Sequence, residues 1–239
     1  MTAFSYSINP EIFDVHPEYR RGVVVFRNLD NSQQQPGITQ QLRSSEADLR
    51  ERIVGNPAEY PQIAAWRDAY RQFGAKPSEH RSSIEALSRR VLKPDSLPDI
   101  NTLVDIGNLL SLRYVLPAGV HPITARSQNV ELRKASALDR FLAEPGKEPE
   151  LISPDEIVLA ADNRVLTRRW TWRQAADTRT LPETSFVFFD IDGLPPCTVV
   201  DVKAAIADLT HLVSRFCGGE CLGYAILDVG KPSLSIILE

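Results

Sequence analysis

The segment LPDINTLVDIGNLLSLRYVLPAG, residues 97–119, is the stretch around which the rest of the chain is organised. It holds the longest apolar run of the sequence, and we expect a helix over residues 100–112. A helix that is apolar on nearly every face is usually buried. Asn101, Asp105 and Asn108 follow one another at i, i+4 and i+7 and therefore share one narrow face of this helix. An unpaired buried polar group costs about 1–3 kcal/mol, so these side chains either form a structural network or line the floor of a binding cleft.

The composition outside this segment is that of a soluble globular protein. The chain has 239 residues, of which 43% are hydrophobic and 24% charged, and this suffices for one large domain or two small ones. Because no internal repeat, low-complexity tract or linker divides the sequence, we expect one domain over residues 1–239 with a core of about residues 19–228. The net charge of −4 provides no overall basic field for a long nucleic acid. Long DNA is therefore not expected as a partner, and any contact with RNA would be local.

Cysteine content and hydropathy bear on metal binding and on location. The three cysteines, Cys197, Cys217 and Cys221, are odd in number and lack zinc-ligand spacing. We expect reduced structural thiols and no metal site. No apolar run reaches the roughly 18 residues of a membrane span, and residues 1–10 lack the basic region and apolar core of a secretory signal. We therefore expect a cytoplasmic protein with no membrane partner.

The remaining segments predict a mixture of helices and strands. A β-branched run at residues 22–26 is typical of a central strand. Apolar residues at helical spacing predict further helices at residues 38–54, 58–73, 79–93 and 201–216. Short strands are expected at residues 130–133, 141–142, 156–160, 165–168, 185–191, 221–229 and 233–238, and the alternation of bulky and basic side chains over residues 166–173 is typical of a half-buried strand. This order predicts an α+β fold with a mixed sheet and packed helices.

Motifs of the common catalytic classes are absent. The sequence has no glycine-rich phosphate loop, no GxSxG elbow and no HExxH pair, which disfavours nucleotide triphosphate chemistry and zinc hydrolysis. Of the four histidines, His121 stands out because it follows the Pro117–Gly119 turn that leaves the central helix. A second candidate wall is the stretch of residues 170–184, which offers Arg173, Thr178 and Thr180. Its threonines either satisfy β-propensity or hold a ribose, a phosphate or an amino acid ester.

A run of short matches gives the chain a family resemblance. It includes Trp66, Gly74, Asp99-Ile100-Asn101, Leu103-Val104-Asp105, Gly107-Asn108, the stretch from Ser83 to Arg90, and Trp170-Thr171-Trp172-Arg173. These residues resemble the B3/B4 editing domain of the bacterial phenylalanyl-tRNA synthetase β subunit, and more closely the free-standing members of that family. The resemblance implies a phenylalanyl-tRNA synthetase β-subunit editing-domain-like fold. It also implies a tRNA-binding protein of translation quality control that hydrolyses the ester of a mischarged aminoacyl-tRNA without a metal or cofactor.

The resemblance also assigns roles to residues. Such a site must position a water, stabilise an oxyanion and discriminate among amino acid side chains. The implied catalytic residues are Asn108, His121 and Asp105. The implied substrate-binding residues, for the tRNA acceptor end or an aminoacyl-adenosine-like ligand, are Gly107, Arg89, Arg90, Arg173, Thr178 and Thr180.

The sequence departs from the family at two positions. Gly107 stands where the family keeps threonine, and the glutamate of the family's pocket has no clear counterpart at Ala176 or Asp177. An alternative hypothesis is therefore a non-catalytic module that binds tRNA or an amino-acid-like ligand in the same cleft. A third hypothesis is a structural or partner-binding protein, which a fully paired and sealed polar stripe on the central helix would favour.

Overall fold

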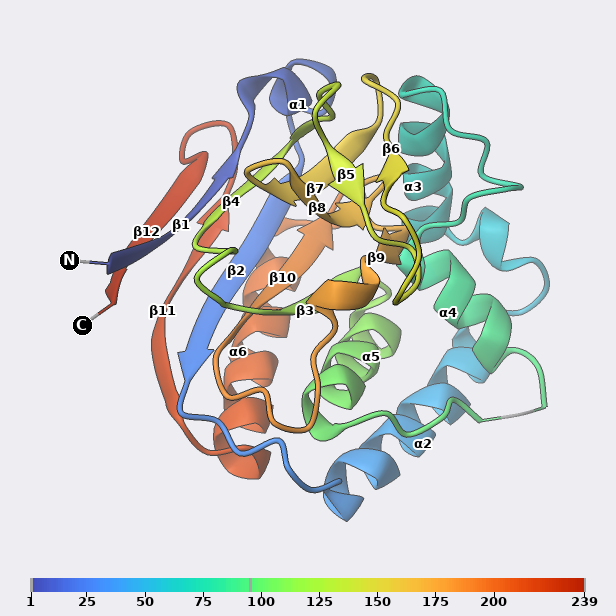
Figure 1. Ribbon diagram of the computed structural model, residues 1–239. Helices are drawn as coiled ribbons and strands as arrows, with labels where there is room; N and C mark the ends of the chain where they lie inside the picture. Colours follow the sequence, from blue (N-terminus) through green and yellow to red (C-terminus); the bar gives the residue numbers. More distant parts are fainter. Residues whose placement is uncertain (1, 95, 239) are drawn as a thin grey trace.

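Two β-sheets form the centre of the computed structural model, which describes residues 2–94 and 96–238 (Figure 1). The larger sheet has the strand order β12-β1-β4-β7-β8-β5-β6, and β9 pairs with β8. Its strands are β1 (Thr2–Ile8), β4 (Asn129–Lys134), β5 (Arg140–Phe141), β6 (Glu150–Leu151), β7 (Ile157–Ala161), β8 (Arg164–Arg168), β9 (Arg173–Gln174) and β12 (Ser233–Leu238). The smaller sheet has the order β11-β2-β10-β3, formed by β2 (Arg20–Arg27), β3 (Ala118–Pro122), β10 (Val187–Gly193) and β11 (Glu220–Leu227).

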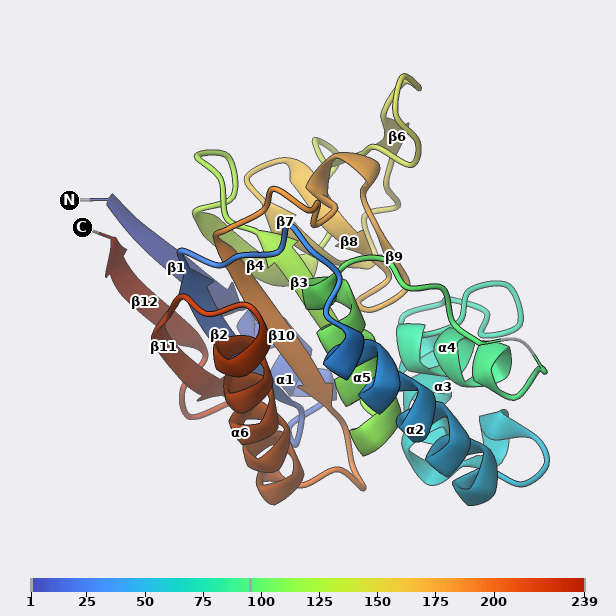
Figure 2. The same cartoon turned by 90° about the horizontal axis from the view of Figure 1, so that it is seen from below.

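The helices pack mainly against one face of the smaller sheet. Helices α5 (Thr102–Tyr114) and α6 (Val199–Phe216) lie side by side on this face, and α2 (Pro36–Arg52), α3 (Pro61–Gln72) and α4 (Ser83–Val91) lie beyond α5 (Figure 2). The short elements are α1 (Pro10–Val15), η1 (Pro57–Glu59) and η2 (Ala176–Thr178). Helices and both kinds of sheet pairing are thus combined, and the predicted α+β class is confirmed.

The second face of the smaller sheet packs on the larger sheet. Along β10, Phe188 contacts Phe4 and Tyr6 of β1, with ring centroids 5.4 and 5.5 Å apart. Phe189, the next residue, points to the opposite face, where its ring lies 4.0 Å from the position that a Cβ at Gly107 of α5 would occupy. Because side chains alternate along a strand, every second residue of β10 from Phe188 faces the space between the sheets.

The central helix is buried as predicted, but its polar stripe is divided. Asn101 is the N-cap of α5, and its Oδ1 accepts from the Val104 amide at 3.1 Å. Asn31 donates to the same Oδ1 at 3.1 Å, and Asn101 Nδ2 donates to the Thr180 carbonyl at 3.0 Å. Asn101 therefore ties the start of α5 to two loops that are distant in sequence, as a structural network would.

Some element predictions were wrong. The stretch 166–173 is not one strand, because Arg169 and Trp170 have φ of 45° and 63° and turn the chain after β8. This turn buries the Trp170 ring against Tyr19 and Trp66, with centroids 4.8 and 5.2 Å apart. The helix expected at 79–93 begins only at Ser83, where Ser82 caps it. Strand β3 was missed, so His121 lies within a strand and does not follow a turn at residues 117–119. Strand β1 was missed as well, although Phe4, Tyr6 and Ile8 alternate with half-buried residues in the period-2 pattern of a strand.

Candidate functional site

A cavity of about 140 Å³, here called the inner cavity, lies between the two sheets. Its walls come from β2, β3 and β10 of the smaller sheet and from β8, β9 and the turn between them on the larger sheet. The lining residues are Arg21, Ser83, Pro117, Ala118, Gly119, His121, Thr167, Trp170, Thr171, Trp172, Arg173, Gln174, Asp190 and Asp192.

The register of the smaller sheet gathers the polar residues of this cavity. Asp190 of β10 pairs with Gly119 of β3, and Asp192 pairs with Arg21 of β2. His121 of β3 pairs with Phe188, and its ring stacks on the phenylalanine with the centroids 4.8 Å apart. All of these positions fall on the face that looks toward the larger sheet, because they are separated by two residues along their strands.

Arg21 and Asp192 form the anchor of a buried ionic cluster. Arg21 Nε and Nη2 each lie 2.8 Å from an oxygen of Asp192, and the Tyr19 hydroxyl donates to the same carboxylate. Arg21 Nη1 donates to the Tyr6 hydroxyl at 2.5 Å. Burial raises the pKa of Asp192 to about 6, against the opposing charge of Arg21. Each oxygen of the Asp192 carboxylate thus accepts a hydrogen bond from a group that is itself buried.

Asp190 and His121 are held less tightly than this anchor. Asp190 Oδ2 lies 3.3 Å from the Tyr6 hydroxyl, 3.4 Å from Arg21 Nη2 and 3.6 Å from His121 Nε2. Gln174 Nε2 approaches the other ring nitrogen, Nδ1, at 3.2 Å. Burial lowers the pKa of His121 below its ordinary value, and the nearby Asp190 only partly offsets this. This lowered pKa favours the neutral form of the imidazole.

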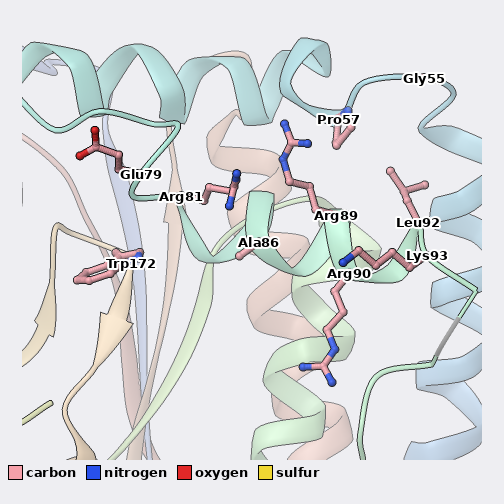
Figure 3. Close-up of a pocket in the computed structure, with 10 residues that line it drawn as sticks. All are labelled: Gly55, Pro57, Glu79, Arg81, Ala86, Arg89, Arg90, Leu92, Lys93 and Trp172. Atoms are coloured by element: carbon pink, nitrogen blue, oxygen red, sulfur yellow. The ribbon is translucent and has the colours of Figure 1, made fainter. Parts of the chain in front are cut away.

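A second, larger hollow of about 750 Å³ lies on the surface beside α4, and we call it the outer groove (Figure 3). Four cations line it: Arg81, Arg89, Arg90 and Lys93. They come from α4 and the segments on either side of it (Figure 3). Among the described residues of the lining, Glu79 is the one acidic residue against four cations, which gives this part of the groove a local positive charge in a chain of net charge −4. Such a cluster provides the point charges that phosphate groups bind.

Trp172 lines both the outer groove and the inner cavity. Its ring is half-buried, with the Arg169 guanidinium 4.5 Å from its centroid and the His80 ring 4.7 Å away. Ser83, the first residue of α4, donates its amide to the Thr171 carbonyl at 2.8 Å. This bond joins the helix of the groove to the turn that carries Trp172, so the two hollows share a wall.

Glu85 of α4 holds arginines from three segments: Arg67 of α3, Arg81 before α4, and Arg89 of α4. Its fully buried carboxylate accepts from Arg67 Nη1 at 2.7 Å and from Arg89 Nε at 2.9 Å, and Arg81 Nε lies 3.9 Å away. Three guanidinium groups thus share one carboxylate, and Arg89 Nη2 also donates to Asn56 Oδ1 at 3.3 Å. Arg90 and Lys93 form no ion pair with the described residues.

The structure brings together some of the residues selected from the sequence. Arg89 and Arg90 line the outer groove, and His121 and Arg173 line the inner cavity. Arg173 is half-buried, and its Nη2 donates to the Ala143 carbonyl at 3.1 Å. These four residues lie on the two sides of Trp172.

The other selected residues lie away from the lining of both hollows. Asp105 accepts from the Ile100 amide at 3.2 Å and from Gln34 Nε2 at 2.6 Å, and burial raises the pKa of this carboxyl above its ordinary value. Gly107 of α5 faces the smaller sheet, and Asn108, the next residue of the same helix, is half-buried. The Thr178 and Thr180 hydroxyls donate to the carbonyls of Ala175 and Val120, respectively.

Three members of the ionic cluster were missed in the sequence: Arg21, Asp190 and Asp192. The sequence did contain evidence for this cluster. Asp190 lies inside the strongly apolar segment of residues 185–191, and Asp192 follows directly after it, two residues from Asp190. Charged residues that share one face of a buried strand need partners, and Arg21 directly precedes the other strongly apolar strand.

Two further findings bear on the sequence expectations. Among the described residues, no group of three or more His, Cys, Asp or Glu side chains is arranged to hold a metal ion. The described helices include none that is both long and apolar enough to cross a membrane.

Comparison with known proteins relates this site to a family. The family model for the B3/4 domain matches residues 65–218, which include α4, β3 and β10. Among solved structures, the chain is similar to an N-terminal fragment of the phenylalanyl-tRNA synthetase β-subunit from Pyrococcus horikoshii, at 12% sequence identity and a TM-score of 0.45. The match covers 90% of this chain and 49% of that fragment, so the chain spans about half of its length. No curated protein matches the chain.

Proposed function

We propose that this chain, which belongs to the B3/4 domain family, binds the acceptor end of a tRNA and hydrolyses the ester of a mischarged aminoacyl-tRNA. The observation that carries the proposal is the junction of a cationic outer groove with a buried polar cavity at Trp172. An aminoacyl-tRNA end has the same two parts, because it joins a phosphate chain to a small polar acyl group. The groove receives the phosphates, and the cavity receives the aminoacyl ester.

The sizes of the two hollows support this division. A cavity of about 150 Å³ holds one benzene molecule, and the inner cavity measures about 140 Å³. It therefore has room for one aminoacyl group and no room for a nucleoside beside it. The outer groove, at about 750 Å³, has room for nucleotides. Trp172, at the boundary, is an aromatic surface next to the position that the terminal nucleoside would occupy.

His121 is the residue we assign to the chemical step. In hydrolysis a water oxygen attacks the ester carbonyl carbon, and the neutral imidazole accepts the proton of that water. The bond from the carbonyl carbon to the ribose oxygen then breaks, and the ribose oxygen takes up the proton. Arg173, which lines the same cavity from the larger sheet, supplies positive charge toward the carbonyl oxygen as the oxyanion forms. The step consumes one water and releases a free amino acid and a free tRNA end.

The polar stripe of α5 has a supporting role in this proposal. Asn101 and Asp105 fix the N-terminal end of the helix through the hydrogen bonds described above. Helix α5 in turn packs on β3, which carries His121, and on α4, which carries the arginines of the groove. These two side chains therefore act on the site through the position of α5.

A deacylation assay with a panel of mischarged tRNAs tests the proposal. The unaltered protein should release amino acid above the buffer rate for at least one pair. His121→Ala should lower the rate by about 10² or more, as loss of a general base does. The matched control is Lys203→Ala, which removes an exposed cation of α6 and should leave the rate unchanged. If no pair is hydrolysed above the buffer rate, the hydrolase proposal fails.

The alternative function is a non-catalytic module that binds tRNA or an aminoacyl-adenosine-like ligand in the same two hollows. The observation that favours it is the distance of 3.6 Å between His121 Nε2 and Asp190 Oδ2, which is too long for the hydrogen bond that usually orients a general base. This function predicts saturable tRNA binding without turnover. The substitution His121→Ala would then weaken binding and have no rate to lower.

A further inference from the structure

Asp190 is a buried carboxylate with one oxygen left unsatisfied. The residue is 3% exposed, and its Oδ2 faces Tyr6, Arg21 and His121 at distances of 3.3–3.6 Å. Its Oδ1 accepts no hydrogen bond from the residues the structure describes. This atom lies beside Gly119, where an added Cβ would come within 2.6 Å of it. The absence of a side chain at Gly119 therefore keeps the Oδ1 edge of the carboxylate open to the inner cavity.

The charges around Asp190 do not balance. Asp190 and Asp192 contribute two carboxylates, whereas Arg21 is the one permanent cation in contact with them among the residues the structure describes. Most of its guanidinium is engaged by Asp192, with two nitrogens at 2.8 Å. Burial lowers the pKa of the His121 imidazole and so disfavours its cationic form, and Tyr6 and Tyr19 contribute hydroxyl groups. A buried carboxylate without a full partner is unfavourable, and a ligand that brings a cationic donor would complete this cluster.

We infer that Asp190 Oδ1 binds the α-ammonium group of the substrate's aminoacyl moiety, and that the inner cavity selects esters of amino acids whose amine is free. This inference rests on the proposed function, because it assigns the aminoacyl group to the inner cavity. An N-acylated amino acid, such as the end of a peptidyl or formylated chain, carries a neutral amide instead of an ammonium. It supplies no positive charge for Asp190, and its acyl carbon and oxygen need extra room in a cavity of about 140 Å³.

Asp190 is thus a specificity residue with a role separate from that of His121. The ammonium and the scissile ester of an aminoacyl group are attached to the same α-carbon. Gly119 and His121 are two residues apart on the same face of β3. A substrate held at Asp190 beside Gly119 therefore has its ester carbonyl close to the imidazole.

Binding of matched probes tests the inference without relying on turnover. The probes are adenosines that carry an amino acid in amide linkage at the 3′ position, each made with a free amine and with an N-acetyl group. A panel with alanine, serine, phenylalanine and tyrosine side chains covers different sizes. Isothermal titration calorimetry with the full chain should show the free-amine probe binding about 100-fold or more tightly than its acetylated partner for at least one side chain.

The isosteric variant Asp190→Asn should reduce this preference to below about fivefold. Lys203→Ala should retain the full preference. Thermal melting reports whether the Asp190→Asn variant is folded. If this variant does not fold, the comparison of the two probes on the unaltered protein still tests the inference.

The outcomes separate this inference from the proposed hydrolase. A protein that prefers the free amine but hydrolyses no ester supports the inference and refutes the hydrolase. An active enzyme that binds and cleaves free and N-acylated esters equally well overturns the inference while the hydrolase stands. The inference is also overturned if no probe of the panel binds at about 1 mM.

Discussion

Salt dependence offers a quantitative test of the outer groove, because each cation that contacts a phosphate displaces counterions from the RNA. For a single strand, log K falls with log salt by about 0.7 per contact. The groove contains four cations, Arg81, Arg89, Arg90 and Lys93. If all four contact phosphates of the single-stranded acceptor end, the slope is about −2.8. The affinity should then fall about 50-fold between about 50 and about 200 mM salt.

Arg90 and Lys93 are the cations to remove first, because Arg81 and Arg89 share the Glu85 carboxylate. Arg90→Ala should reduce the slope to about −2.1, and the double variant with Lys93→Ala should reduce it to about −1.4. Removal of exposed surface charges should leave the fold intact. Fluorescence anisotropy with a labelled tRNA acceptor minihelix at four salt concentrations measures each slope.

The control for this series is Lys203→Ala. It removes the same type of charge from α6, which lies on the other side of α5 from α4 (Figure 2). Its slope should equal that of the unaltered protein. A double variant that keeps the full slope would refute the assignment of phosphates to the groove. A slope near zero in the unaltered protein would refute it as well, since four cations in contact with phosphates must produce a salt dependence.

Three further predictions concern stability. Replacing the buried Glu85 by Gln removes the carboxylate that Arg67 and Arg89 share. Because these arginine side chains are 19% and 36% exposed and water screens part of their charge, we expect the free energy of unfolding in urea to fall by about 2–3 kcal/mol. A loss below about 1 kcal/mol would contradict this view of the carboxylate. Gly107→Ala should raise Tm by about 2–4 °C in calorimetry, because alanine favours a helix over glycine by about 1 kcal/mol. The new Cβ would lie 3.8 Å from its nearest neighbour, which is an ordinary contact. A lower Tm would show that this face of the helix has no room for a methyl group. The pKa of Asp192 is raised to about 6 by burial, so the folded state binds its proton more tightly than the unfolded chain does, and stability should fall by up to about 3 kcal/mol as pH rises from about 4 to about 6. Asp192→Asn should remove this component, and an unchanged pH profile would contradict it.

Helices α2 to α6 and most strands could be predicted because their evidence is local, whereas the short helix α1 was missed. The central helix is an apolar stretch preceded by a capping residue, Asn101, and both features are visible in the sequence. The segment 166–173 shows where local evidence fails. Its alternating pattern persists, but Arg169 and Trp170 adopt left-handed backbone angles that place the Trp170 ring in a pocket formed by residues distant in sequence. Such tertiary packing overrides the local strand preference.

The candidate site was predicted in part for a similar reason. Arg89, Arg90, His121 and Arg173 could be selected because they lie near motifs of a known family, and they line the two hollows. The ionic cluster depends on strand register, since Arg21 meets Asp192 only when β2 pairs with β10 in one alignment. No local pattern specifies that alignment.

The central helix connects these observations. The sequence left two alternatives for its polar stripe, a structural network or the floor of a cleft. Asn101 and Asp105 are engaged by loop residues at the N-terminal end of α5, and they do not line either hollow described here. Nevertheless, α5 contacts both β3 and α4, which are walls of the inner cavity and the outer groove. A buried network of this kind can fix the distance between two binding surfaces without contacting a ligand. In the proposed function the stripe acts through the placement of α5, and the chemistry is assigned to His121 of the smaller sheet and Arg173 of the larger sheet.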